Sequence, residues 1–148
     1  MKSKFHHIVR AVVIKDEKLL VAEYIGHHYF LPGGHVEIGE SAEHALIREL
    51  REELGVNCSI KQFLGVIENR WQDKEMLHHE INHIFEVSSK ELYIDLSPKS
   101  RESHLAFHWI DYSKESLKTY KIMPMPSVKE LLERKLNDEL LNCWISNF

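Results

Sequence analysis

The chain of 148 residues has the length of one domain of ordinary size, and its 43% hydrophobic and 28% charged residues are typical of a globular protein with a buried core. The net charge of -4 excludes a general nucleic-acid binder, which needs a basic surface. A small anionic substrate stays compatible with this charge, because a bound metal ion reverses the local potential. We therefore expect a single domain over residues 1–148 that binds a small molecule and no extended nucleic acid.

The sequence has no targeting signal and no cysteine motif. Residues 1–7 lack the apolar run of a signal peptide, and no stretch approaches the ~20 apolar residues of a membrane span. Cys58 and Cys143 lie far apart and have no metal-binding spacing. These features predict a cytoplasmic protein with two free thiols and no contact with a membrane.

The N-terminal part of the chain predicts a hairpin. Residues 8–14 are β-branched and apolar apart from Arg10, which is typical of a buried strand. A polar turn at residues 15–18 follows, and residues 19–24 return as a second strand. We expect these two strands to pair in antiparallel fashion.

A helix is predicted next, after a short aromatic strand at residues 29–31 and a Pro-Gly-Gly loop. Ser41 is a good N-cap, and neither Pro nor Gly interrupts the chain from Ala42 to Leu54. Gly55 follows at the position where a left-handed C-cap residue is favoured. The pattern predicts a helix over residues 42–54.

The second half of the chain predicts further strands and a last helix. Residues 56–67 are mostly extended, residues 69–75 form a polar loop that holds Trp71, and alternation predicts a strand over residues 80–87. Another strand is marked by Leu105, Phe107 and Trp109. Ser127 is the expected cap of the last helix, whose apolar stripe consists of Val128, Leu131, Leu132, Leu136 and Leu140. Strands interleaved with two helices predict a mixed α/β domain with helices packed on a mixed sheet.

Three carboxylates stand out on the first predicted helix. At 100° per residue, Glu49, Glu52 and Glu53 fall within an arc of about 100° beside the apolar stripe, close enough to converge on one point. Like charges at these spacings repel by a few tenths of a kcal/mol per pair. A divalent cation would remove the repulsion, and carboxylate oxygens suit Mg²⁺ or Mn²⁺. The alternative for the carboxylates alone is a solvated acidic helix face.

The wider spacing favours the metal-binding interpretation. The chain reproduces the pattern GX5EX7REUXEEXGU, where U is aliphatic, through Gly34, Glu40, Arg48, Glu49, Leu50, Glu52, Glu53, Gly55 and Val56. Seven fixed residues at about 7% frequency each coincide by chance on the order of once in 10⁸ windows. This segment resembles the signature box of the Nudix hydrolase (MutT-like) family.

The resemblance implies a fold and a set of roles. The fold is a Nudix-type α/β/α sandwich with a mixed β-sheet, in which the box forms loop-helix-loop. The implied catalytic and metal-binding carboxylates are Glu49, Glu52 and Glu53, with a main-chain carbonyl near Gly34 completing the sphere of Mg²⁺ or, alternatively, Mn²⁺. Residues that hold the box together would be Glu40, Arg48 and Gly55.

Residues outside the box are weaker candidates. The family often uses an additional glutamate as the base, and the candidates in this chain are Glu80 and Glu102, each of which is otherwise a surface residue. Tyr29, Phe30 and Trp71 are candidates for stacking on a nucleobase. A zinc site of His78, His79 and His83 is disfavoured, because adjacent strand residues point to opposite faces.

The implied activity is that of a metal-dependent pyrophosphohydrolase that cleaves a nucleoside diphosphate linked to another moiety, by attack of water at phosphorus. The alternative is a catalytically silent nucleotide-binding sensor of the same fold. A protein contact through the C-terminal helix is compatible with either, and the sequence leaves a homodimer open. Substrate identity depends on loops outside the box.

Overall fold

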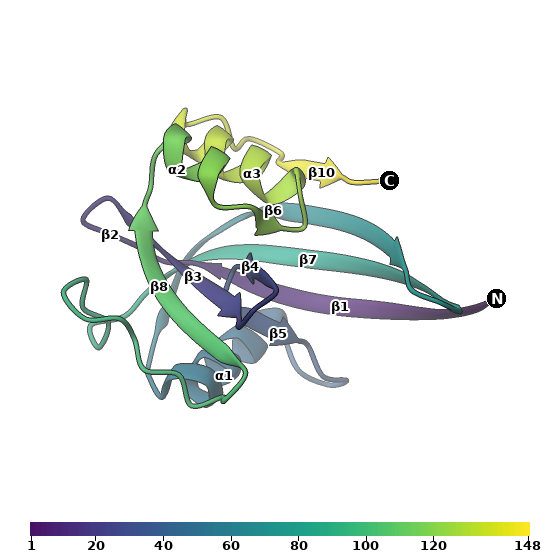
Figure 1. Cartoon of the computed structure of the whole chain (residues 1–148), viewed down its shortest axis with the longest axis horizontal. Helices are drawn as coiled ribbons and strands as arrows, with labels where there is room; N and C mark the ends of the chain where they lie inside the picture. Colours follow the sequence, from purple (N-terminus) through teal and green to yellow (C-terminus); the bar gives the residue numbers. More distant parts are fainter.

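The computed structural model describes residues 1–148 and arranges them in two mixed β-sheets with helices on both sides (Figure 1). One sheet has the strand order β10-β6-β7-β1-β5, and the other has the order β2-β3-β4-β9 with β8 also paired to β3. The strands are β1 (Lys2–Val12), β2 (Ile14–Lys15), β3 (Lys18–Tyr24), β4 (His28–Phe30), β5 (Gly33–His35), β6 (Ser59–Gln72), β7 (Met76–Ser88), β8 (Leu105–Asp111), β9 (Ile122–Met123) and β10 (Trp144–Ser146). The helices are α1 (Ala42–Leu54), α2 (Lys114–Thr119) and α3 (Ser127–Leu136).

The strands at the centre are buried on both faces, which explains their continuous apolar sequences. In β1, Val9 and Ala11 belong to a core cluster with α1, whereas Val12 belongs to a second cluster with α3. In β3, Leu20 belongs to the cluster with α1 and Leu19 belongs to the cluster with α3. Two-sided burial gives near-continuous apolar runs in place of alternation. The structure therefore confirms the α/β/α arrangement with mixed strand pairing.

The predicted opening hairpin is wrong in its extent. Strand β1 pairs in parallel with β7 and in antiparallel fashion with β5, whereas β3 lies in the other sheet. Only the two-residue β2 pairs with β3, through Ile14 opposite Leu19 and Lys15 opposite Lys18. The chain changes sheets around Val13. The sequence does not reveal this change, because a strand with apolar side chains on both faces gives no local signal of which sheet it joins.

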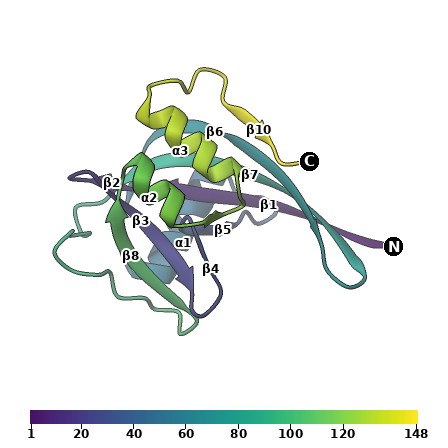
Figure 2. The ribbon, with the colours of Figure 1, turned by 45° about the horizontal axis from the view of Figure 1, so that its top comes forward.

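The predicted polar loop at residues 69–75 is also wrong. Strand β6 continues to Gln72 and places Trp71 directly opposite His78 of β7, so that only residues 73–75 form the turn. Together with the N-terminal end of β1, this hairpin extends beyond the rest of the molecule (Figures 1 and 2). Polar residues on a solvent-facing strand resemble a loop in sequence, and only the pairing reveals the strand.

Helix α1 begins and ends as the sequence predicts. The Ser41 side chain accepts a hydrogen bond from the backbone N–H of His44 at 3.2 Å. Gly55 has φ 69°, and its N–H donates to the Arg51 carbonyl. Glycine is favoured in this left-handed conformation because it has no Cβ to clash.

The last helix departs from the prediction at its N-terminus. Pro126 is the N-cap, and Ser127 is the first helical residue, with a buried hydroxyl that has no hydrogen-bond partner. Val128, Leu131 and Leu132 are buried as expected, but Leu140 lies beyond the helix end. The short elements α2, β9 and β10 were not predicted from the sequence, although Ser113 caps α2 by accepting a hydrogen bond from the backbone N–H of Ser116.

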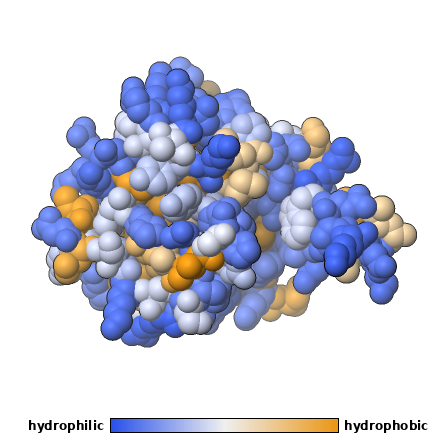
Figure 3. Space-filling view, viewed as in Figure 1, coloured by the Kyte–Doolittle hydropathy of each residue, from blue (hydrophilic) through white to orange (hydrophobic).

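The surface is mostly hydrophilic in the view of Figure 3, where the apolar patches are small and separated. None of the three helices is both long and apolar enough to cross a membrane.

Replacing Ser127 with Ala tests the assignment of Pro126, in place of Ser127, as the N-cap of α3. Because the Ser127 hydroxyl is buried and unpaired, Ser127→Ala should leave the free energy of unfolding unchanged or raise it by up to about 1 kcal/mol. Ser41→Ala is the matched control and should lower it by about 1 kcal/mol. Urea denaturation of both variants measures the difference, and a loss for Ser127→Ala equal to that for Ser41→Ala would contradict this cap assignment.

Candidate functional site

Arg48 joins the loop before α1 to the helix itself. Its Nε donates to Glu40 Oε2 at 2.7 Å and its Nη2 donates to Glu40 Oε1 at 2.9 Å, which is a bidentate pair. Nη2 also donates to the His35 carbonyl at 3.0 Å. The hydrogen bonds from Arg48 lower the pKa of the Glu40 carboxyl to about 2. These contacts fix the loop against the helix.

The three box glutamates differ in depth along α1. The Glu52 side chain is 54% exposed and accepts a hydrogen bond from Arg48 Nη1 at 3.3 Å. Glu49 accepts from the same Nη1 at 3.0 Å and is mostly buried. Glu53 is buried, and its Oε2 has no hydrogen-bond partner. The structure thus orders the carboxylates from solvent to interior.

Electrostatics link the two inner glutamates. Burial, together with the charge of Glu49, raises the pKa of Glu53 to about 8, although Arg10 opposes the shift. Burial also raises the pKa of Glu49, against the hydrogen bond from Arg48. Ionised Glu53 is therefore poorly compensated in this arrangement.

Convergence of the three carboxylates is only partial. No group of three His, Cys, Asp or Glu side chains is arranged to hold a metal ion, and Glu49 and Glu52 are both bonded to Arg48. The donors nevertheless fit a divalent cation. Glu53 Oε2 lacks a partner, and a Cβ on Gly34 would collide with the Glu49 carboxylate, so glycine lets that carboxylate lie against the backbone. A cation would compete with Arg48 for Glu49 and Glu52.

A cavity of about 760 Å³ lies beside Glu53, between the two sheets. Glu53 is the one box glutamate among its lining residues, which are Arg10, Tyr24, His28, Phe30, Glu53, Asn69, Arg70, Trp71, Glu80, Asn82, His104, Leu105, Met123, Pro124, Met125 and Asn147. This volume lies within the range of small-molecule sites.

Of the candidates outside the box, Phe30, Trp71 and Glu80 line this cavity, whereas Tyr29 does not. Tyr29 packs against Tyr120, with ring centroids 5.4 Å apart, and contributes to the core. Glu102 is not a lining residue, but the neighbouring Arg101 donates its backbone N–H to the Glu53 carbonyl at 2.7 Å, and the charge of Glu102 raises the pKa of Glu53.

Sequence reasoning missed an amide cluster around Glu80. Glu80 Oε1 accepts from Asn69 Nδ2 and Asn82 Nδ2, both at 3.2 Å. Asn147, just beyond β10, donates to Asn69 Oδ1 at 3.0 Å. These residues are far apart in the chain, so only the pairing of β6 with β7 and β10 brings them together.

Sequence reasoning also gave no role to Arg10, the one charged residue in an apolar strand segment. Its Nη1 donates to the Leu31 carbonyl at 3.2 Å, and its guanidinium lies over the Phe30 ring, 5.2 Å from the centroid. The interruption of the apolar pattern was the signal that could have identified it.

The histidines form no zinc site from His78, His79 and His83. His78 bonds His6 at 2.8 Å and stacks on Trp71, with centroids 3.6 Å apart. His79 packs against Phe5 on the other face of the sheet, as strand alternation predicts. His83 bonds His7 instead, and each ring is thus engaged with a different neighbour.

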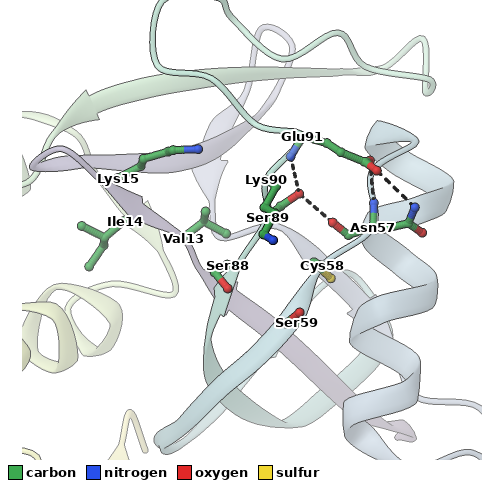
Figure 4. A pocket seen from close by; sticks show the side chains of 10 residues that line it. All are labelled: Val13, Ile14, Lys15, Asn57, Cys58, Ser59, Ser88, Ser89, Lys90 and Glu91. Atoms are coloured by element: carbon green, nitrogen blue, oxygen red, sulfur yellow. Dashed lines mark hydrogen bonds between the residues drawn. The ribbon is translucent and has the colours of Figure 1, made fainter.

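A second cavity of about 430 Å³ lies away from the box glutamates (Figure 4). Its wall is fixed by Glu91, which accepts from the backbone N–H of Asn57 at 2.9 Å, and by Ser89, which donates to the Asn57 carbonyl at 2.6 Å. Burial raises the pKa of the Cys58 thiol at this wall, which disfavours the nucleophilic thiolate. This cavity offers no chemistry comparable to that at Glu53.

The raised pKa of Glu53 predicts how stability depends on pH in the metal-free protein. Between pH 4.5 and about 8 the folded state keeps a proton that the unfolded chain has lost, so the stability falls as pH rises through this window. Glu53→Gln removes the cost of ionising a buried carboxyl group. It should therefore raise the melting temperature at pH 8, on the order of 4 °C for each kcal/mol gained in the free energy of unfolding, with a smaller rise at pH 5.

The control is Glu52→Gln, because the Glu52 side chain is half exposed. Thermal denaturation in EDTA at pH 5 and pH 8 measures both variants. The same change in melting temperature at both pH values for Glu53→Gln would show that Glu53 is ionised in the folded protein.

Comparisons with known proteins show the family of this chain. The model of the NUDIX domain matches residues 4–131. An ADP-ribose pyrophosphatase of Methanocaldococcus jannaschii is 35% identical over 81 residues, which are 52% of this chain and 47% of that protein. A putative 8-oxo-dGTP diphosphatase of Bacillus subtilis is 46% identical over 48 residues, 32% of each chain. The matched segments thus span about half or less of these relatives.

Solved structures share the fold over most of the chain. The E. coli ORF135 protein has a TM-score of 0.63 at 25% identity and covers 91% of each chain. A MutT protein from Bacillus halodurans has a TM-score of 0.69 at 17% identity, covers 92% of this chain and 85% of its own, and shows the fold alone. Since the family model matches most of the chain and includes the complete box, this protein belongs to the Nudix family.

Proposed function

We propose that this protein is a metal-dependent pyrophosphohydrolase that cleaves a diphosphate linkage in a small nucleotide-type substrate. The observation that carries the proposal is the buried Glu53 carboxylate, whose Oε2 has no hydrogen-bond partner, at the wall of a cavity of about 760 Å³. An uncompensated carboxylate beside a substrate-sized space is what a cation bridging protein and phosphate would complete.

The relatives support the bond type more than the substrate. Their names include an ADP-ribose pyrophosphatase, a putative 8-oxo-dGTP diphosphatase and a CTP pyrophosphohydrolase. The substrates in these names differ in the base and in the second moiety, and share a phosphoric anhydride attached to a nucleoside. We infer that this shared part is what the present protein acts on.

The residues of the box would hold one or more Mg²⁺ or Mn²⁺ ions through Glu49, Glu52 and Glu53, together with a carbonyl near Gly34. When bound, the cation would neutralise phosphate oxygens and make a water molecule more acidic. Arg48 would keep the loop and helix in register while Glu49 and Glu52 turn toward the cation, since it also holds Glu40 and the His35 carbonyl.

The proton of the attacking water needs a base, and Glu102 is the better of the two candidates. Its carboxylate makes no hydrogen bond to another side chain, it lies in the loop that precedes β8, and the neighbouring Arg101 donates its backbone N–H to the Glu53 carbonyl. Glu80 is held through one oxygen by two amides, which suits binding of the substrate more than movement of a proton.

Phe30 and Trp71 would contact the nucleoside. Both line the cavity, and aromatic rings stack on bases irrespective of base identity. One face of Trp71 is covered by His78, so a base would use the other face or the edge of the indole.

Hydrolysis of a substrate panel tests the proposal. Purified protein is incubated with Mg²⁺ and ADP-ribose, nucleoside triphosphates or dinucleoside polyphosphates, and the products are separated by chromatography. Glu53→Gln should lower turnover about 100-fold or more while the protein stays folded, because it removes a charged oxygen at the proposed cation site. Tight nucleotide binding by the wild type without any turnover would instead support the catalytically silent sensor.

The assignment of the base is tested by Glu102→Gln and Glu80→Gln. Loss of a general base lowers the rate about 10²- to 10⁴-fold, so Glu102→Gln should lower kcat in this range with little change in KM. Glu80→Gln should chiefly raise KM. A large loss of kcat for Glu80→Gln alone would transfer the role of base to Glu80.

A further inference from the structure

Arg10 is an arginine whose hydrogen-bonding capacity is mostly unused. A guanidinium has five N–H donors, and the side chain of Arg10 makes one hydrogen bond, to the Leu31 carbonyl. Glu53, Glu80 and Glu49 are near enough to act on its charge, but none of them forms an ion pair with it. The remaining donors belong to a residue that lines the main cavity.

The position of Arg10 is fixed from several sides. Strand β1 is paired on both edges here, with Arg10 opposite Gly33 of β5 and opposite Ile84 of β7. The guanidinium lies over the Phe30 ring, which limits its movement. A fork of donors held in place in this way is pre-organised for a planar or tetrahedral anion.

A purely structural role explains these contacts poorly. An arginine retained only to balance the acidic side chains would gain most by direct ion pairing with one of them. Arg48 does this with Glu40 in the same molecule. Arg10 instead stays apart from the carboxylates and faces the space that a substrate would occupy.

We propose that Arg10 binds the substrate directly, donating two hydrogen bonds to non-bridging oxygens of its diphosphate. This inference rests on the proposed function. The diphosphate would lie between the cation held by Glu49, Glu52 and Glu53 and the guanidinium of Arg10. Arg10 would then neutralise the phosphate oxygens that the cation does not neutralise. It would also balance the negative charge of the phosphate that leaves.

Binding of inorganic pyrophosphate tests this contact without requiring turnover. Wild type, Arg10→Gln and Arg10→Lys are titrated calorimetrically with pyrophosphate in the presence of Mg²⁺, and melting temperatures are measured in parallel. Arg10→Gln should weaken binding roughly 10- to 100-fold, the effect of losing charge-assisted hydrogen bonds. Arg10→Lys should recover only part of the loss, because an ammonium keeps the charge but not the fork.

The control is Arg134→Gln, which removes an exposed arginine paired with Glu130 on α3 and should leave pyrophosphate binding within twofold of wild type. Wild-type affinity in folded Arg10→Gln, or full recovery in Arg10→Lys, would overturn the bidentate contact, as would a wild type that binds no pyrophosphate. If Arg10→Gln does not fold, the comparison of Arg10→Lys with wild type decides.

Hydrolysis assays with the same variants separate this inference from the proposed function. Turnover by the wild type that Arg10→Gln leaves unchanged would retain the hydrolase and remove Arg10 from substrate binding. Pyrophosphate binding that depends on Arg10, in a protein that hydrolyses none of the substrates, would retain the contact and remove the hydrolase.

Discussion

The same turn of α1 that buries Leu50 and Leu54 in the core also carries the Glu53 carboxylate into the interior. Removal of a carboxylate from water disfavours its ionisation, and here the neighbouring Glu49 adds a like charge. The apolar contacts of the helix hold this unfavourable arrangement in place. Much of the proposed chemistry depends on it, because a cation gains most where protein charge is least compensated.

Arg48 joins the preceding loop to the same helix near the surface. It binds Glu40 of the loop on one side and Glu49 and Glu52 of the helix on the other. The loop and helix therefore form a rigid unit before any cation is present. Glu49 and Glu52 are both bonded to Arg48, so occupation of the site would require them to exchange an arginine for a metal ion.

The wall facing this unit is built by different strands. Arg10 comes from β1, Glu80 and Asn82 from β7, and Asn69 from β6. Charges of both signs therefore surround one cavity, which is lined by the carboxylates of Glu53 and Glu80 and by the guanidinium groups of Arg10 and Arg70. A substrate with an anionic centre and hydrogen-bonding groups at its ends matches this distribution of charge.

The sequence by itself determined the loop-helix-loop, because its information is local. Caps at Ser41 and Gly55, helical spacing of the glutamates and the fixed intervals from Gly34 to Val56 all lie within about two dozen consecutive residues. Mixed α/β architecture followed from the same kind of pattern. Each of these features depends on residues that are close along the chain, so their order is sufficient to predict them.

Only the tertiary structure decided how strands are distributed between two sheets, where Trp71 lies and which residues face Glu53. A strand that is apolar on both faces fits either sheet, and a polar strand at the surface resembles a loop, so neither partner nor register is encoded locally. Arg10, Glu80 and Asn147 meet across separations of dozens of residues. The cavity exists because pairing between distant strands brings these residues together. Which strands pair depends on burial of the whole core.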